Sequence, residues 1–218
     1  MSDLAILVLE QPWDEPAGGT RRLTVLPFFE GLEKIHRGIA VYYSTFHDAQ
    51  GIRAALKADL LQAREPRQVL YIGSHGSRGH VGGVRLDVLR RIMDEHKDQM
   101  KRVEGIIISS CDVFQSSQEL LRMLKPTNLR WAVSYSCSIG WFDSMVIELA
   151  LLNALAEEPT SAYRLSQARL KEFFQRAFRL INGAHQFEWN GKGTIAEHLL
   201  IAIKARSNAV PSLFQPFH

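Results

Sequence analysis

The sequence predicts an α/β protein with a mainly parallel β-sheet flanked by helices on both faces. Short apolar runs alternate along the chain with helical stretches of a dozen residues or more, which is the order of βαβ units. Runs such as "GIIIS" are almost continuously apolar, which is typical of strands covered on both faces. The 218 residues are 46% hydrophobic and 22% charged, so we expect a single domain spanning residues 1–218.

Five strands are expected in chain order. Each is a short apolar run rich in β-branched or aromatic residues, at 4–10, 39–46, 68–74, 103–111 and 129–138. Two of these runs end on residues that carry chemistry. The third run stops at "SHGS" and the fourth at "SSCD".

Helices are expected between these strands, where apolar residues recur at helical spacing. They lie beyond Pro27 and at 48–64, 79–96, 116–125 and 143–158. The C-terminal third, residues 158–218, is expected to be mostly helical. Within it, the apolar run at 196–206 fits either a helix or a last strand.

Composition excludes several classes of function. The formal charge of +3 is too small to indicate nucleic-acid binding, and the basic residues are spread over helical patterns. No apolar run approaches the roughly 20 residues that span a bilayer, so no membrane contact is expected. The first residues lack the basic region and cleavage site of a signal peptide, so a cytoplasmic location is expected.

No metal or cofactor is expected. Four of the histidines outside the motif have no ligand spacing among themselves, namely His80, His96, His185 and His198. The glycines after the third strand do not form a phosphate-binding loop, because no GK[ST] or helix-opening GxGxxG motif follows the first strand.

His75 and Cys111 form the candidate catalytic pair. They end consecutive strands, 36 residues apart in the chain. If the strands are neighbours, their tips lie about 4.8 Å apart, which lets an imidazole serve as the base for a thiol nucleophile. The backbone N–H of Gly76 can act as an oxyanion donor beside that of Cys111. A helix starting soon after Cys111 is expected to lower the thiol pKa.

These motifs resemble caspase-like (clan CD) cysteine peptidases, over roughly residues 1–157 by strand order. The chain lacks a QACRG-type pentapeptide, and its His-to-Cys interval is shorter than the roughly 50 residues of caspases, so it is most similar to the compact bacterial CHAT-type branch. The resemblance implies a caspase-like three-layer sandwich, with His75 as base, Cys111 as nucleophile and Gly76 in the oxyanion hole. It also implies a protein or peptide substrate, an activating protein partner, and a role as an effector in bacterial (antiviral) defence.

Other interpretations stay open at this point. Cys137 ends the fifth strand and is a rival nucleophile, although either cysteine can be an inert buried thiol. Asp112 fits a helix N-cap. The chain can also be a non-catalytic α/β module, or an inactive caspase-like relative, that binds a partner at the strand tips.

The segment "SCSIGWFDS" is expected to line the pocket for the P1 side chain of the substrate (S1), because the same segment does so in the family that the chain resembles. Trp141 can form an apolar wall and Asp143 can supply a negative charge, which favours Arg or Lys at P1. Alternatively, Asp143 caps the helix that follows.

Overall fold

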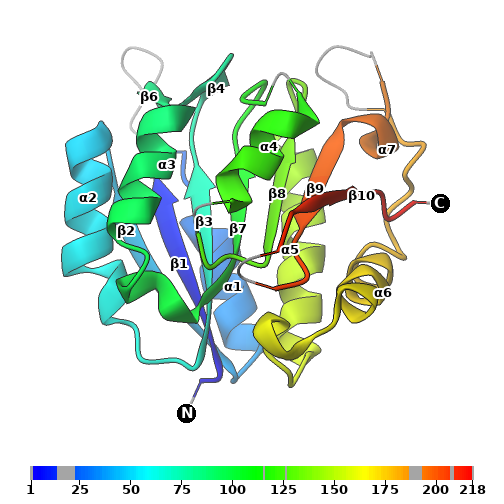
Figure 1. Cartoon of the computed structure of the whole chain (residues 1–218), viewed down its shortest axis with the longest axis horizontal. Coiled ribbons are helices and arrows are strands. Elements are labelled where there is room, and N and C mark those ends of the chain that lie inside the picture. The colour runs from blue at the N-terminus through cyan, green and yellow to red at the C-terminus, as the bar shows by residue number, and fades with distance from the viewer. Residues whose placement is uncertain are drawn as a thin grey trace.

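A seven-stranded sheet lies at the centre of the chain, between helices (Figure 1). The structure is a computed structural model that describes residues 2–13, 23–114, 116–125, 127–186, 193–206 and 209–217. The order of the strands across the sheet is β10-β9-β8-β7-β3-β1-β2. Their bounds are β1 Leu4–Glu10, β2 Ile39–Thr45, β3 Arg67–Gly73, β7 Val103–Ser109, β8 Trp131–Tyr135, β9 Leu199–Ile203 and β10 Ser212–Phe214.

The five expected strands are all present and pair in parallel, which confirms the mainly parallel sheet. Two C-terminal strands, β9 and β10, extend the sheet in antiparallel pairing. A separate three-stranded sheet follows β3 directly. It consists of β4 Gly76–Ser77, β5 His80–Val81 and β6 Val84–Arg85.

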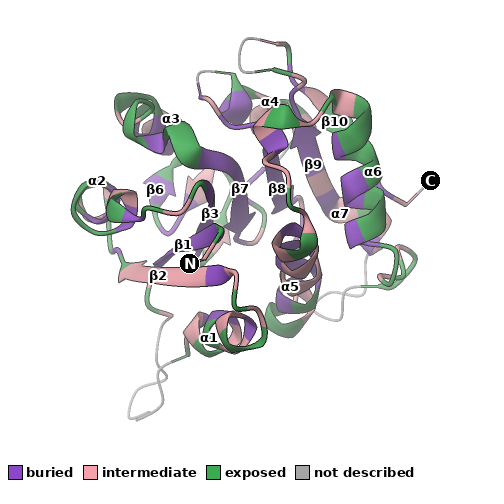
Figure 2. Cartoon of the chain, turned by 90° about the horizontal axis from the view of Figure 1, so that it is seen from below, coloured by how far each residue is buried: buried purple, intermediate pink, exposed green. Residues whose placement is uncertain are grey.

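The helices form two layers, one on each face of the large sheet. Figure 2 shows α2, α3 and α4 on one side of the strands, and α1 and α5 on the other. The bounds are α1 Leu26–Ile35, α2 Ala49–Ala58, α3 Leu86–Glu95, α4 Ser117–Leu124, α5 Trp141–Glu157, α6 Gln167–Ala177 and α7 Ile195–His198, with 3₁₀ turns at Leu60–Gln62, Gln99–Arg102 and Ala162–Arg164.

Strand β3 shows how the sheet separates two hydrophobic cores. Val69 and Tyr71 pack with residues of α1, α5 and α6, whereas Leu70 and Ile72 pack with residues of α2, α3 and α4. All seven residues of β3 are buried, because alternate side chains point to opposite faces and both faces are covered. This double burial explains why the strand sequence is apolar without interruption from Val69 to Gly73.

The C-terminal third is less helical than the sequence predicts. Its longest helix is α6, and the ambiguous run at 196–206 forms the short helix α7 followed by strand β9. A five-residue apolar run carries too little periodicity to separate a strand from a buried helix. The backbone of β8 decides the outcome, because β9 pairs with it over five residues, from Leu199 opposite Tyr135 to Ile203 opposite Trp131.

Candidate active site

The ends of β3 and β7 bring His75 and Cys111 to one edge of the sheet. The two strands are parallel neighbours, with Gly73 opposite Ser109, which confirms the expected adjacency. His75 and Cys111 each lie two residues beyond these strand ends. A backbone hydrogen bond from Ser74 N to Ser109 O, 3.2 Å long, extends the pairing to the residue before His75. Ligands bind at this carboxyl edge in open α/β sheets.

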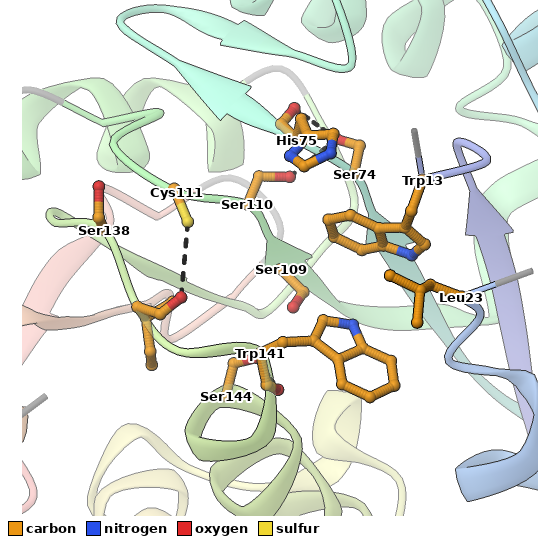
Figure 3. Close-up of a pocket in the computed structure, with 11 residues that line it drawn as sticks. Trp13, Leu23, Ser74, His75, Ser109, Ser110, Cys111, Ser138, Trp141 and Ser144 are labelled. Atoms are coloured by element: carbon orange, nitrogen blue, oxygen red, sulfur yellow. Dashed lines mark hydrogen bonds between the residues drawn. The ribbon is translucent and has the colours of Figure 1, made fainter. Parts of the chain in front are cut away.

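Both side chains line one cavity of about 430 Å³ (Figure 3). Its walls combine large apolar side chains with a row of serines from the strand ends. The lining residues are Trp13, Leu23, Ser74, His75, Ser109, Ser110, Cys111, Ser138, Ile139, Trp141 and Ser144. A concave, largely apolar site with a few polar groups is the usual form of a substrate pocket.

The thiol of Cys111 is turned toward the carbonyl of Ile139, with Sγ 3.7 Å from the oxygen (Figure 3). Burial raises the pKa of this thiol, a backbone hydrogen bond with Ile139 lowers it in part, and the charge of Asp112 raises it further. The expectation of a lowered pKa is therefore wrong. Helix α4 begins only at Ser117, six residues after Cys111, so its positive end does not immediately follow the thiol.

Asp112 forms the sharp turn that follows Cys111. Its φ of 50° lies in the left-handed region, which Asp tolerates better than most residues. Its N–H donates to Cys137 O at 3.2 Å, and its carboxylate accepts from Ser138 Oγ at 2.9 Å. Asp112 is therefore not a helix N-cap; it fixes the turn that places Cys111 at the strand end.

Gly76 lies directly against the backbone of Cys111. A Cβ at position 76 would stand 2.1 Å from Cys111 O and 2.7 Å from Cys111 N, so only glycine fits there. This contact brings the main chain of the two segments together at the place where two N–H groups could bind an oxyanion.

Cys137 lies apart from the cavity wall. It is 7% exposed and packs in the core beneath α5, and burial raises its pKa to about 12. The structure brings His75 together with Cys111 around the cavity, and leaves Cys137 outside the residues that line it.

The structure separates the two residues that the sequence assigns to the S1 pocket. Trp141 lines the cavity and packs edge-on against Phe28, with ring centroids 5.3 Å apart. Asp143 lies in the first turn of α5, where its Oδ2 would stand 2.8 Å from a Cβ placed on Gly140, the residue before the helix. Asp143 is not among the residues that line the cavity. It is not the N-cap either, because Gly140 holds that position and Asp143 lies inside the first turn, where its charge faces the positive end of the helix.

A different carboxyl lies behind the cavity. Glu148 of α5 is fully buried, and it accepts hydrogen bonds from the hydroxyls of Tyr71 at 3.0 Å and Tyr135 at 3.1 Å. The hydroxyl of Ser109, which lines the cavity, also bonds to it. Burial raises the pKa of Glu148 to about 7, against the opposing effect of these three hydrogen bonds. The available signal was an acid inside the apolar helix "MVIELALL".

Trp13 is a second residue that sequence reasoning missed. Its indole lies edge-on to the imidazole of His75, with ring centroids 4.8 Å apart and an interplanar angle of 79°. It follows the end of β1, which is the strand beside β3, and so belongs to the same sheet edge as His75. The signal in the sequence was the position of Trp13 shortly after a strand that neighbours the strand of His75.

The described part of the chain holds neither a metal-ligand cluster nor a membrane-spanning helix. No group of three or more His, Cys, Asp or Glu side chains comes together there as a metal site would require. No helix there has the combined length and apolar character needed to cross a membrane.

Comparison with known proteins gives a structural match only. No family model matches the chain, and no curated protein sequence matches it. The chain is similar in structure to a secreted C11 cysteine protease from Bacteroides thetaiotaomicron, determined by X-ray crystallography in complex with an irreversible peptide inhibitor. The TM-score is 0.51 at 10% sequence identity, over 95% of this chain and 67% of the protease chain.

The chain has a caspase-like fold. The expected α/β sandwich, a mainly parallel sheet between helical layers, is confirmed by this likeness and by the strand order. In the caspase-like fold of this chain, the cavity lies at the carboxyl ends of β3 and β7.

Proposed function

We propose that the protein is a cysteine endopeptidase in which Cys111 is the nucleophile and His75 is the general base. The observation that supports this most is the placement of an imidazole and a thiol after neighbouring parallel strands, around one cavity large enough for a side chain. The fold that it shares with a C11 cysteine protease agrees with this proposal. A thiol needs a base placed by a rigid scaffold, and two adjacent buried strands are such a scaffold.

The raised thiol pKa indicates how the reaction starts. Because the resting thiol is neutral, His75 takes its proton as Sγ attacks the scissile carbonyl carbon. The N–H groups of Gly76 and Cys111 stabilise the oxyanion. His75 then gives the proton to the leaving amine as the C–N bond breaks. Water, deprotonated by His75, hydrolyses the remaining thioester and restores the thiol.

The contact between Cys111 and Ile139 defines the first step of substrate binding. The thiol must turn away from the Ile139 carbonyl before it can attack a substrate. A substrate backbone that occupies the cavity beside Ile139 would compete for that carbonyl and release the thiol. The resting arrangement is therefore a protected form of the nucleophile.

We propose a preference for Arg or Lys at P1, which rests on the resemblance of the segment that contains Trp141 and Asp143. Neither Asp143 nor the buried Glu148 lines the cavity, and burial raises the pKa of Glu148 to about 7, so Asp143 is the carboxylate through which the preference is tested. Cleavage after Arg should be compared with cleavage after citrulline, which has the same shape without the charge. Asp143→Asn should lower the Arg-to-citrulline ratio of kcat/KM, and Glu148→Gln should leave it unchanged. A ratio near 1 in the wild type would contradict the preference.

A non-catalytic binding module remains the second candidate, and the same thiol favours it. Cys111 is neutral at rest and bonded to a backbone carbonyl, as in a thiol that does no chemistry. In that case peptides would bind the cavity without being cleaved.

The finer setting of the peptidase is also a proposal. Membership of the CHAT-type branch, activation by a protein partner and a role in bacterial antiviral defence rest on the resemblance of the two sequence motifs. They do not follow from the geometry of the site.

Peptide cleavage tests the proposed function directly. Fluorogenic peptides with Arg, Lys, Asp or Leu at P1 should be incubated with the full chain and with single variants. Cys111→Ala and His75→Ala should each abolish cleavage, and Cys137→Ala should retain it. Cleavage that survives Cys111→Ala would mean that the wrong thiol was chosen or that a contaminant cleaves the peptide.

A further inference from the structure

Glu10, at the end of β1, is a buried acid with an unusual set of partners. It is 1% exposed, in a strand whose other six residues are apolar. Its Oε1 accepts from Trp13 Nε1 at 2.6 Å and from Val25 N at 2.8 Å. Its Oε2 accepts from Thr24 Oγ1 at 2.5 Å and from Tyr43 OH at 2.7 Å. A buried carboxylate with this many donors holds each of them at a fixed place.

These hydrogen bonds fix the orientation of the Trp13 ring. The indole has a single N–H donor, and that donor is bonded to Glu10. One edge of the ring is therefore anchored, and the rest of the ring lies against His75 and the cavity. Thr24 and Val25, which precede α1, donate hydrogen bonds to the same carboxylate. Glu10 therefore fixes both the Trp13 ring and the start of α1.

The backbone of His75 is fixed separately from its ring. His75 O accepts from Gly82 N at 2.8 Å and from Ser74 Oγ at 3.1 Å. Among the described residues, no hydrogen bond to the imidazole nitrogens is found, and the edge-on contact with Trp13 is the ring contact of His75. In Figure 3 the indole of Trp13 lies beside His75, between it and Leu23.

We propose that Trp13 is a positioning residue for His75, and that Glu10 holds Trp13 in the orientation that this requires. The inference rests on the proposed function, since it assigns His75 as the base. An imidazole without a fixed neighbour rotates about its Cβ–Cγ bond. A general base must present one particular ring nitrogen to the thiol, so this rotation has to be limited. A T-shaped contact with an anchored indole limits that rotation.

Kinetics of four single variants test the proposal. Trp13→Ala should lower kcat by about 10- to 100-fold, because a misplaced catalytic group is costly even when it is still present. Trp13→Phe keeps an aromatic ring but loses the hydrogen bond to Glu10. Its kcat should therefore lie between that of Trp13→Ala and that of the wild type. Glu10→Gln should lower kcat as Trp13→Phe does. Tyr43→Phe is the matched control, since it removes one hydrogen bond to Glu10 without touching Trp13, and kcat should change less than about 3-fold.

Nuclear magnetic resonance of His75 gives a readout that needs no turnover. No hydrogen bond joins Glu10 to His75, yet Glu10→Gln should change the ring-current shift of the imidazole protons by releasing Trp13. Tyr43→Phe should leave that shift unchanged. Thermal melting of each variant would show whether it is folded, and the two Trp13 variants keep the test open if Glu10→Gln does not fold.

The outcomes separate this inference from the proposed function. If His75→Ala leaves cleavage unaffected, the proposed function fails, while the resonance data still decide whether Glu10 controls the imidazole. If His75→Ala abolishes cleavage but Trp13→Ala retains wild-type kcat, the positioning role is wrong. Equal losses of kcat in Tyr43→Phe and Trp13→Ala would also overturn it, since they would reflect general damage to the fold.

Discussion

The buried carboxyl of Glu148 should make the stability of the fold depend on pH near neutrality. Its pKa is raised by burial to about 7, compared with the ordinary value of 4.5 in an unfolded chain. Between these values the folded state holds a proton that the unfolded state releases, so the stabilising contribution is complete below pH 4.5 and is lost as the pH rises through 7. The linkage relation gives a loss of about 2 to 3 kcal/mol between pH 5 and pH 8.

Glu148→Gln removes this titration while keeping the shape and an acceptor for the tyrosine hydroxyls. The difference in unfolding free energy, variant minus wild type, should therefore increase by about 2 to 3 kcal/mol between pH 5 and pH 8. For a chain of this length, that corresponds to a relative rise in Tm of roughly 5 to 10 °C. Urea melts at intervals of half a pH unit would measure it.

The matched control is Glu157→Gln, on the exposed side of the same helix. Its difference from the wild type should stay nearly constant over this range of pH. If Glu148→Gln also shows a constant difference, the carboxyl titrates outside the range, and its role as a buried acid near neutral pH is refuted.

Three further predictions concern the site and its support. Gly76→Ala should lower kcat by about 100-fold, because the new Cβ meets the Cys111 backbone, whereas Gly31→Ala, with open space around it, should not. Iodoacetamide should alkylate Cys111 more slowly at pH 7 than a free cysteine. Asp112→Asn should speed that reaction, because it removes a charge that raises the thiol pKa; an unchanged rate would contradict this effect of Asp112. Glu104→Gln should destabilise the fold by about 3 to 5 kcal/mol in denaturant melts, because it leaves the buried guanidinium of Arg67 without its ion-pair partner. A change under 1 kcal/mol would contradict this.

The fold was predictable because its signals are local and repeat along the chain. Each buried strand is a short apolar run, and the parallel order follows from the helical stretches between the runs. The positions of His75 and Cys111 followed from the same logic, since residues after neighbouring parallel strands meet at one edge. The antiparallel strand β9 did not follow, because its residues pair with residues of β8 that are 64 to 72 positions away in the chain.

The supporting residues of the site were not predictable for a different reason. Whether Asp143 enters the pocket or caps α5 depends on the residue at which the helix begins, and that point cannot be read from the pattern to within one turn. Glu148 and Glu10 are single acids in apolar runs, so the sequence shows that each needs partners but not which ones. The raised pKa of Cys111 depends first on burial, which is a property of the assembled fold.

Covalent labelling tests the proposed Cys111–His75 dyad most directly. The full chain would be treated with a peptidyl chloromethyl ketone carrying Arg at P1, followed by intact-mass measurement and peptide mapping. We expect one adduct per chain, on Cys111, formed many times faster than in His75→Ala and absent from Cys111→Ala. Adduct formation on Cys137, or labelling of Cys111 at the same rate with and without His75, would contradict the dyad.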